Sequence, residues 1–284
     1  MASLRLALIE SGATAQLEGF VLAGAPWRRV RFPSTVGVIE HPTAGVVLFD
    51  TGYSERFFSE TQRFPERLYR WVTPLTLPAG TDTVSQLRAR GIEPEDVRWV
   101  IVSHFHADHI GGLRDFPRAR FICSQQAYTA VRAMGRLQAL RHAVLPGLLP
   151  DDFASRCSLL DSGGKTAALA ELPGFETGWD IFQDGCLVAV PLPGHAPGQI
   201  GLVVRTTTAI FFLVADACWR FESIAARRPP HPITRLIHED MPAYRQTIER
   251  LADLHAARPD ITLVPCHCEA PISTVGASQA PAAG

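Results

Sequence analysis

The sequence lacks a long hydrophobic run and a high cysteine content. No apolar stretch among its 284 residues reaches the roughly 20 residues that a membrane-spanning helix requires. The N-terminal segment Met1–Ile9 contains too short an apolar run for a signal peptide and is followed at once by Glu10. Six cysteines are too few for a disulfide scaffold, and without an export signal we expect reduced thiols. A soluble, cytoplasmic protein is therefore expected.

Charge of one sign is also not in excess, because 27 Lys and Arg residues are matched by 28 Asp and Glu residues, a formal net charge of −1. A nucleic-acid-binding chain usually shows a basic excess or a basic stripe. The densest candidate, Arg220–Arg228, is interrupted by Phe221, Glu222 and Ile224. We therefore expect a small-molecule substrate as partner, and neither nucleic acid nor a membrane. The sequence leaves a homodimer open.

Hydrophobic residues (46%) and charged residues (19%) occur in the proportions of an ordinary globular protein. Seven short runs of mostly β-branched or aromatic residues, bounded by turn residues, predict strands. They are Val46–Phe49, Val97–Val102, Arg120–Cys123, Leu187–Val190, Gly201–Val204, Ile210–Val214 and Ile261–Val264. Their nearly continuous apolar character indicates that both faces of each sheet are covered, which implies helices outside the sheets.

The segments between these runs predict helices at Thr83–Arg90, Gln125–Ala143 and Met241–Ala256. The last has apolar residues at helical spacing and follows Asp240, a residue suited to cap a helix. Stretches 57–78 and 145–164 are punctuated by Pro and Gly and are predicted to be irregular loops. Interleaved strands and helices without a linker indicate one α/β domain over residues 1–269, with a disordered tail over 270–284.

The segment Ser103–Gly112 places three His and one Asp within six positions, directly after a predicted buried strand. His104 and His106 are two residues apart, so they project to the same side of an extended chain and can converge on one ion. The following turn lets Asp108 and His109 point at a second site nearby. Imidazole and carboxylate together suit Zn²⁺ or a similar first-row divalent ion. The segment therefore predicts a metal centre.

This cluster alone cannot complete two metal shells, because each ion usually requires at least three protein ligands. Three further residues share its setting, since each follows a predicted strand: His195, Asp216 and His267. Taken singly, Asp216 fits an ordinary turn equally well. The shared position at strand ends favours the three as the remaining ligands.

Three cysteines flank the predicted ligands, namely Cys218, Cys266 and Cys268. A Cys-x-Cys pair is also a zinc-binding pattern. The His and Asp set is complete without sulfur, so we expect these cysteines to be buried, inert thiols.

In their order along the chain, five features resemble the metallo-β-lactamase superfamily of hydrolases: the segment Phe49–Gly52, the cluster His104–His109, and the single residues His195, Asp216 and His267. The resemblance implies an αββα sandwich, in which two mixed sheets pack face to face with helices outside. It also implies that the metal site lies at one edge of the two sheets.

Carried over residue by residue, the resemblance implies that one metal ion is held by His104, His106 and His195. It implies that the second is held by Asp108, His109 and His267, and that Asp216 bridges both. Asp50 would support the loop that carries the ligands. The expected cofactors are therefore two divalent metal ions per chain, with Zn²⁺ preferred.

Within the superfamily, the sequence looks most like the N-acyl homoserine lactonases, through Gly91–Asp96, Pro193–Gly198 and Asp216–Ala217. These lactonases carry a substrate-contacting Tyr three residues after the bridging Asp, where this chain has Trp219. Trp219 is therefore the candidate substrate contact, although its indole is larger than a phenol. Tyr53 is a second candidate.

We expect a hydrolase that opens a lactone or ester bond through a metal-bridging hydroxide, with Asp108 passing a proton to the leaving oxygen. The apolar part of the substrate is expected to contact loops rich in Phe57, Phe58, Phe64, Leu68 and Trp71. A thioester, as in glyoxalase II, a β-lactam and a phosphodiester are alternative substrates, the last disfavoured by the charge. A non-catalytic ligand-binding relative is a further alternative. A diiron oxidoreductase is disfavoured, because the related ones carry Glu in place of His106.

Overall fold

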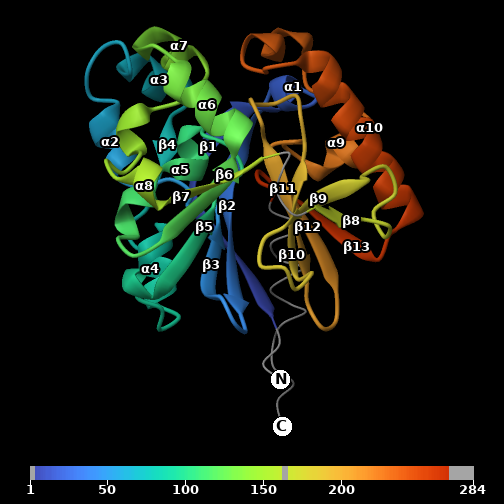
Figure 1. Cartoon of the computed structure of the whole chain (residues 1–284). Helices are drawn as coiled ribbons and strands as arrows, with labels where there is room; N and C mark the ends of the chain where they lie inside the picture. The colour runs from blue at the N-terminus through green and yellow to red at the C-terminus, as the bar shows by residue number, and fades with distance from the viewer. Residues whose placement is uncertain (1–3, 162–165, 269–284) are drawn as a thin grey trace.

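The computed structural model describes residues 4–161 and 166–268, which form two β-sheets packed face to face with helices on both outer sides (Figure 1). The order of the layers is helix, sheet, sheet, helix, so the predicted αββα sandwich is confirmed. The predicted tail over residues 270–284 lies outside the described residues. Within the described ranges, no helix combines the length and the apolar character needed to cross a membrane.

The first sheet has seven strands in the order β4-β1-β2-β3-β5-β6-β7. Strands β1, β2 and β3 pair antiparallel, whereas β3, β5, β6 and β7 run parallel. The carboxyl ends of β3 and β5 therefore meet at the same edge. The strands are β1 (Arg5–Leu17), β2 (Arg29–His41), β3 (Gly45–Phe49), β4 (Leu75–Thr76), β5 (Val97–Ile101), β6 (Arg120–Ser124) and β7 (Cys157–Leu160).

The second sheet has six strands in the order β13-β12-β11-β10-β9-β8. Its pairs are antiparallel except for β12 and β13, which run parallel. Strands β10, β12 and β13 consequently point the same way and end at one edge. The strands are β8 (Thr166–Ala168), β9 (Thr177–Asp180), β10 (Leu187–Pro191), β11 (Ile200–Arg205), β12 (Ile210–Ala215) and β13 (Ile261–Pro265).

Helices cover the outer face of each sheet (Figure 1). Those on the side of the first sheet are α2 (Arg56–Glu60), α3 (Arg67–Val72), α4 (Thr83–Arg88), α5 (Ala107–Ile110), α6 (Gln125–Ala133), α7 (Arg136–Arg141) and α8 (Phe153–Arg156). Those on the side of the second sheet are α9 (Phe221–Ala225) and α10 (Met241–Ala257), and the short α1 (Glu18–Val21) follows β1. Single 3₁₀ turns are η1 (Pro94–Asp96), η2 (Leu113–Asp115), η3 (Pro146–Leu148) and η4 (Pro232–Leu236).

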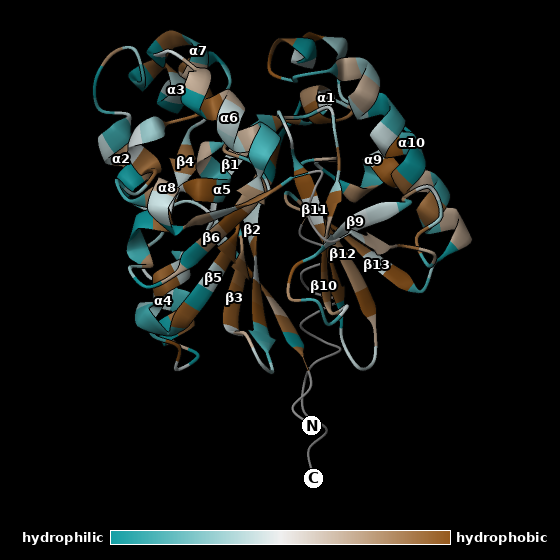
Figure 2. Cartoon of the chain, in the orientation of Figure 1, coloured by the Kyte–Doolittle hydropathy of each residue, from teal (hydrophilic) through white to brown (hydrophobic). Residues whose placement is uncertain are grey.

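Three apolar layers hold the sandwich together. One lies between the first sheet and its helices, one between the two sheets, and one between the second sheet and helices α9 and α10. Figure 2 shows the resulting pattern, with brown along the strands and teal on parts of the outer helices. The strands are thus apolar on both faces, as their continuous hydrophobic runs predict.

Several local predictions were wrong. The single helix predicted over 125–143 is two helices, α6 and α7, because the chain becomes extended at Met134 and Gly135. The predicted loop over 57–78 contains α2, α3 and β4, and that over 145–164 contains η3, α8 and β7. The Pro and Gly residues of these stretches separate short elements rather than abolish them. In contrast, α10 begins as predicted, with Asp240 accepting a hydrogen bond from the backbone of Ala243 at 3.0 Å.

Candidate metal centre

The strand directions bring the predicted ligands to one edge of the sandwich. The cluster that begins at His104 follows β5, and His195 follows β10. Asp216 and His267 follow the parallel strands β12 and β13. The first sheet thus supplies the early ligands and the second sheet supplies the three late ones, across the interface between the two sheets.

A first group of four side chains converges at this edge: His104, His106, His195 and Asp216. Their ligand atoms all lie within 4.8 Å of one another. His195 Nε2 lies 3.0 Å from His106 Nδ1 and 3.3 Å from Asp216 Oδ2. This is a set of nitrogen and oxygen donors around one point, as a divalent ion of the zinc type requires.

A second group shares Asp216 with the first. The Nε2 atoms of His109 and His267 lie 3.3 Å and 3.1 Å from the Asp216 carboxylate. Asp108 Oδ2 lies 3.7 Å and 3.6 Å from the same two nitrogens. Cys266 also falls within this second group. All seven predicted ligands therefore meet, with Asp216 between the two groups.

Buried atoms without partners show that a cation fits here. Among the described residues, His104 Nε2, His109 Nε2 and Asp216 Oδ1 are buried and accept no hydrogen bond. A buried polar atom left unsatisfied costs about 1–3 kcal/mol. Cations at the two groups would satisfy all three, because His104 belongs to the first group, His109 to the second and Asp216 to both. Imidazole and carboxylate are the donors that suit Zn²⁺.

Asp50 lies behind the site and fixes the tautomers of two of the predicted ligands, His104 and His109. Its carboxylate accepts hydrogen bonds from His109 Nδ1 at 2.7 Å and from the backbone N–H and hydroxyl of Ser103, both at 2.7 Å. Because the Ser103 hydroxyl donates to Asp50, its oxygen accepts from His104 Nδ1 at 3.0 Å. Both Nδ1 atoms therefore carry the proton, which leaves both Nε2 lone pairs directed at the centre.

Two residues that the sequence did not reveal in this role lie against the other ligands. His238 Nδ1 lies 3.2 Å from His195 Nδ1, and Trp219 stacks on the His238 ring with centroids 5.0 Å apart. The indole of Trp219 donates a hydrogen bond to Asp216 Oδ2 at 3.1 Å. The backbone of Asp240 donates to Gly194 O at 2.9 Å, which ties the segment carrying His238 to the loop carrying His195.

In a comparison with known protein families, a model of the metallo-β-lactamase superfamily matches residues 29–267. This range includes all seven predicted ligands. The chain belongs to the metallo-β-lactamase superfamily.

Relatives within the superfamily include lactonases. The N-acyl homoserine lactonase AttM of Azorhizobium caulinodans is 32% identical over 149 residues, which cover 49% of this chain and 48% of AttM. The match thus spans about half the length of that relative. The N-acyl homoserine lactonase AiiB of Agrobacterium fabrum is 23% identical over 266 residues, which cover 89% of this chain and 90% of AiiB.

A solved structure of an N-acyl homoserine lactone hydrolase, with the product N-hexanoyl-L-homoserine bound at its catalytic metal centre, shares the fold. The TM-score is 0.69 at 20% identity, and the match covers 96% of this chain and 97% of the other. The metallo-β-lactamase fold is thereby established for the present chain.

Burial keeps the three histidines of the first ligand group unprotonated. It lowers the pKa of His104 and of His195 well below the usual value, and it lowers the pKa of His106 to about 4. All three imidazoles are therefore neutral near pH 7. Neutral imidazole is the form that binds a metal ion.

The second group favours positive charge. Burial opposes protonation of His109 and His267, yet Asp108 beside the former and Asp216 beside the latter raise both pKa values well above the ordinary one. Burial would raise the pKa of Asp216, but the neighbouring histidines, His267 first among them, hold it well below its usual value. The carboxylates thus stabilise positive charge at a position where a divalent cation would supply it.

The predicted substrate contacts differ in accessibility. Tyr53 is buried with its ring packed edge-on against Phe57, 5.2 Å between centroids, and burial raises its pKa well above the usual value. Phe57 is fully buried, so it belongs to the core rather than to a substrate surface. Phe64 and Trp71 are exposed. The predicted apolar substrate surface therefore cannot include Phe57. Phe64 and Trp71 are accessible and stay candidates for it.

The centre opens on one side. His106 and Asp108 are 8% and 9% exposed, whereas the other five predicted ligands are at most 3% exposed. A small hollow of about 10 Å³ borders His106 and His195, and most of its other lining residues are apolar, among them Phe105 and Val131. The side of His106 and Asp108 is therefore the most exposed side of the centre.

Three cysteines, Cys218, Cys266 and Cys268, flank the ligands. Cys218 and Cys268 are buried, and burial raises the pKa of Cys218 well above its usual value, which keeps it a neutral thiol. Cys266 donates to the Thr35 carbonyl at 3.8 Å. These features fit the predicted inert thiols, although Cys266 is close enough to the second group to be a ligand atom.

Proposed function

We propose that the chain is a dinuclear metal-dependent hydrolase that opens a lactone or ester bond, with N-acyl homoserine lactones as the first substrate class to test. The observation that carries the proposal is the position of Asp216, whose carboxylate lies within 3.3 Å of imidazole nitrogens from both ligand groups. One carboxylate between two sets of nitrogen donors is the arrangement that a pair of divalent ions requires. The relatives named above support the choice of lactones.

The two ions, when bound, would supply Lewis acidity and a nucleophile at neutral pH. His104, His106 and His195 would hold one, and His109, His267 and Asp108 the other, with Asp216 shared. Zn²⁺ is the preferred identity because the donors are imidazole and carboxylate.

Asp108 is the residue placed to move a proton. Its Oδ2 lies 3.6–3.7 Å from the two imidazoles of the second group, and its side chain is partly exposed on the open side of the centre. The carboxyl group can therefore hold a proton on its outer oxygen and pass it to the leaving alkoxide. A positioned general acid of this kind typically contributes 10²–10⁴-fold to the rate.

For Trp219 we propose a role other than the predicted substrate contact. Its indole N–H is engaged by Asp216, and its side chain is 7% exposed. We infer that Trp219 holds the shared carboxylate in place and does not reach the substrate carbonyl. Tyr53 remains a proposed contact, and its buried ring limits it to a substrate group that enters deeply.

Ligands come from both sheets, so we also propose that residues 1–269 form one functional domain.

The test is a substrate panel on protein loaded with zinc, containing acyl homoserine lactones, simple esters, a glutathione thioester and a chromogenic cephalosporin. The expected result is turnover of lactones that stops on chelation and falls at least 100-fold in Asp108→Asn. The exposed carboxylate of Asp151, paired with Arg114 at 2.7 Å, supplies the matched control Asp151→Asn. Turnover of the thioester alone would assign the alternative substrate class, and a metal-loaded protein inactive on all four classes would contradict hydrolysis.

A further inference from the structure

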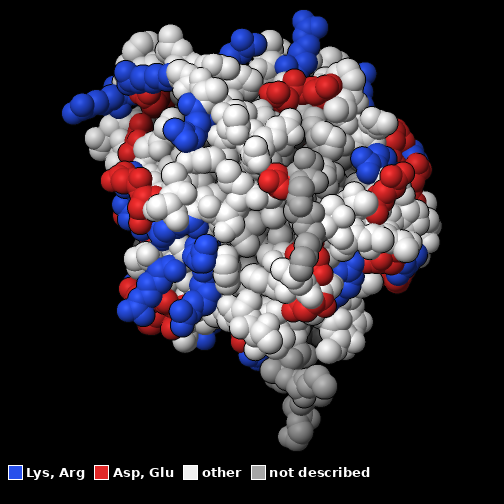
Figure 3. Space-filling model, in the orientation of Figure 1, with Lys and Arg blue, Asp and Glu red and all other residues white. Residues whose placement is uncertain are grey.

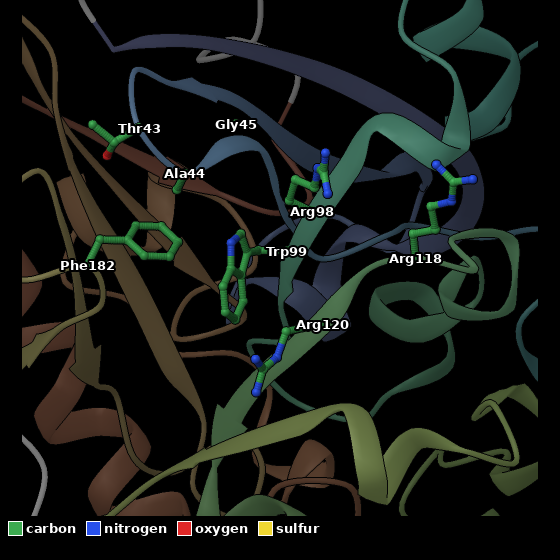
Figure 4. A pocket seen from close by; sticks show the side chains of 8 residues that line it. All are labelled: Thr43, Ala44, Gly45, Arg98, Trp99, Arg118, Arg120 and Phe182. Atoms are coloured by element: carbon green, nitrogen blue, oxygen red, sulfur yellow. The ribbon is translucent and has the colours of Figure 1, made fainter.

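A second concave region lies at the opposite edge of the sandwich from the metal centre. It is lined where strands β3, β5 and β6 begin, at Gly45, Arg98 and Arg120, whereas the metal ligands follow strand ends. The cleft has a volume of about 660 Å³. Figure 4 shows its walls, with Arg98 and Arg118 on one side, Phe182 on the other and Trp99 between them. We call it the distal cleft.

Three guanidinium groups of the distal cleft have no anionic partner. Within the described ranges, Arg98, Arg118 and Arg120 form no ion pair, and no Asp or Glu lines the cleft. Elsewhere many arginines are paired, as Arg136 is with Glu66 at 2.6 Å. Neighbouring like charges without compensation repel one another, so a bound anion would be stabilised here. On the face seen in Figure 3, Arg side chains also gather over the region of β5 and α4.

The adjoining carboxylate and histidine do not compete for this role. Asp184 lies 3.0 Å from His41 Nε2. His41 Nδ1 accepts hydrogen bonds from the backbone N–H groups of Thr43 and Ala44, at 3.3 Å and 3.2 Å. The proton of the imidazole therefore sits on Nε2 and faces Asp184, so His41 has no free lone pair for a metal ion. This contact instead braces the turn that forms one wall of the cleft.

Apart from Thr43, the residues that line the rest of the distal cleft are apolar or aromatic. Trp99 and Phe182 pack edge to face with ring centroids 5.6 Å apart, and the Arg120 guanidinium lies 5.3 Å from the Trp99 ring. Both aromatic residues also line a neighbouring hollow of about 270 Å³, whose wall includes Ile122 and Leu159. The lining of this hollow also includes Ser158, Asp180 and Gln183, so the surface that continues from the arginines into it is apolar in part.

We propose that the distal cleft binds an amphipathic organic anion, with a phosphate or carboxylate head on the three guanidinium groups. Its aliphatic or aromatic body lies across Trp99 and Phe182 into the neighbouring hollow. Arginine is suited to such a head because its planar fork donates two parallel hydrogen bonds to one anion. Because this cleft lies at the edge remote from the metal ligands, its ligand does not compete with a substrate of the metal centre.

Calorimetric titration with decyl phosphate, below its micelle-forming concentration, tests the proposal. Inorganic phosphate supplies the head alone and decyl maltoside supplies the same chain with an uncharged head. We expect decyl phosphate to bind at least tenfold more tightly than either, and less tightly as salt is raised. The double variant R98A/R118A should weaken this binding at least tenfold. R98K/R118K, which keeps the charge but not the fork, should fall between.

The matched control is R141A/R245A, which removes two exposed arginines that form no ion pair among the described residues and lie outside the cleft. Hydrolysis of the best substrate should be unchanged in R98A/R118A, which separates this site from the metal centre. Equal decyl phosphate binding by R98A/R118A and R141A/R245A would overturn the proposal. Binding to phosphatidylglycerol vesicles without binding of monomeric decyl phosphate would overturn it as well, in favour of a membrane surface.

Discussion

Replacing Asp50 by Asn tests how the protein orients its metal ligands without replacing any of them. Asp50 has a φ of +63°, a left-handed conformation that Asn adopts nearly as well, so the backbone should be retained. Both carboxylate oxygens accept hydrogen bonds, one from the Ser103 N–H and the other from the Ser103 hydroxyl and His109 Nδ1. An amide has only one accepting oxygen, so one of these buried donors must face an N–H group.

The magnitude follows from the number of donors affected. One buried donor without an acceptor costs about 1–3 kcal/mol. This cost is avoided if His109 changes tautomer, so that its proton sits on Nε2 and its Nδ1 accepts from the amide. That tautomer no longer has the Nε2 lone pair directed at the second metal position. Loss of such a supporting partner typically weakens metal affinity by about 10–100-fold, which is about 1.4–2.7 kcal/mol.

The assay is competition for zinc against a chromogenic chelator, followed by metal analysis after dialysis. We expect D50N to retain its fold and to lose affinity at the second position by about 10–100-fold. The control is D115N, since Asp115 carries a surface ion pair with Arg56 at 2.7 Å. Unchanged affinity for both ions in D50N would refute the role of Asp50 in fixing the tautomers.

Four further outcomes are expected. Asp108→Asn should lower kcat by about 10²–10⁴-fold with zinc content kept near two per chain, and loss of zinc instead would show that Asp108 acts mainly as a ligand. Ser103→Ala removes the acceptor of His104 Nδ1 and should weaken binding of the first ion about tenfold, as chelator competition measures; equal affinity would contradict the relay from Asp50. Chelation should lower Tm, because a ligand at 100 times its Kd stabilises the folded state by about 2.7 kcal/mol, and a Tm indifferent to zinc would contradict a buried site. Gly194→Ala should lower the free energy of unfolding in urea by at least about 2 kcal/mol, since φ is +121° and a Cβ would overlap the backbone of Tyr244, whereas Gly80→Ala, at φ +81° in open space, isolates the backbone strain and should cost less.

Much of the fold could be predicted because buried strands leave a clear signal. The seven predicted apolar runs coincide with β3, β5, β6, β10, β11, β12 and β13 to within one or two residues. The long hairpin of β1 and β2 was not predicted. Strand β1 contains Gly12 at φ +81° and a register shift between Glu10 and Ala13, and β2 contains Pro33. Glycine and proline inside a strand are the residues that obscure its pattern.

In the candidate site, too, the residues with a local sequence signal could be predicted and the others could not. The short motif at His104 and the rule that ligands follow strand ends place seven side chains that the structure brings together. Ser103 stood in that motif, but its role depends on a hydrogen bond to Asp50, 53 positions away. His238 lies in an irregular segment after η4 and has no local signal. Partners behind the ligands are set by tertiary packing, so sequence spacing does not reveal them.

Anomalous diffraction at the zinc edge, from crystals of zinc-loaded protein, would place the ions directly. We predict two peaks on either side of the Asp216 carboxylate, one within bonding distance of His104, His106 and His195 and the other beside His109 and His267. A single peak, or peaks that leave Asp216 without a metal neighbour, would contradict a shared dinuclear centre.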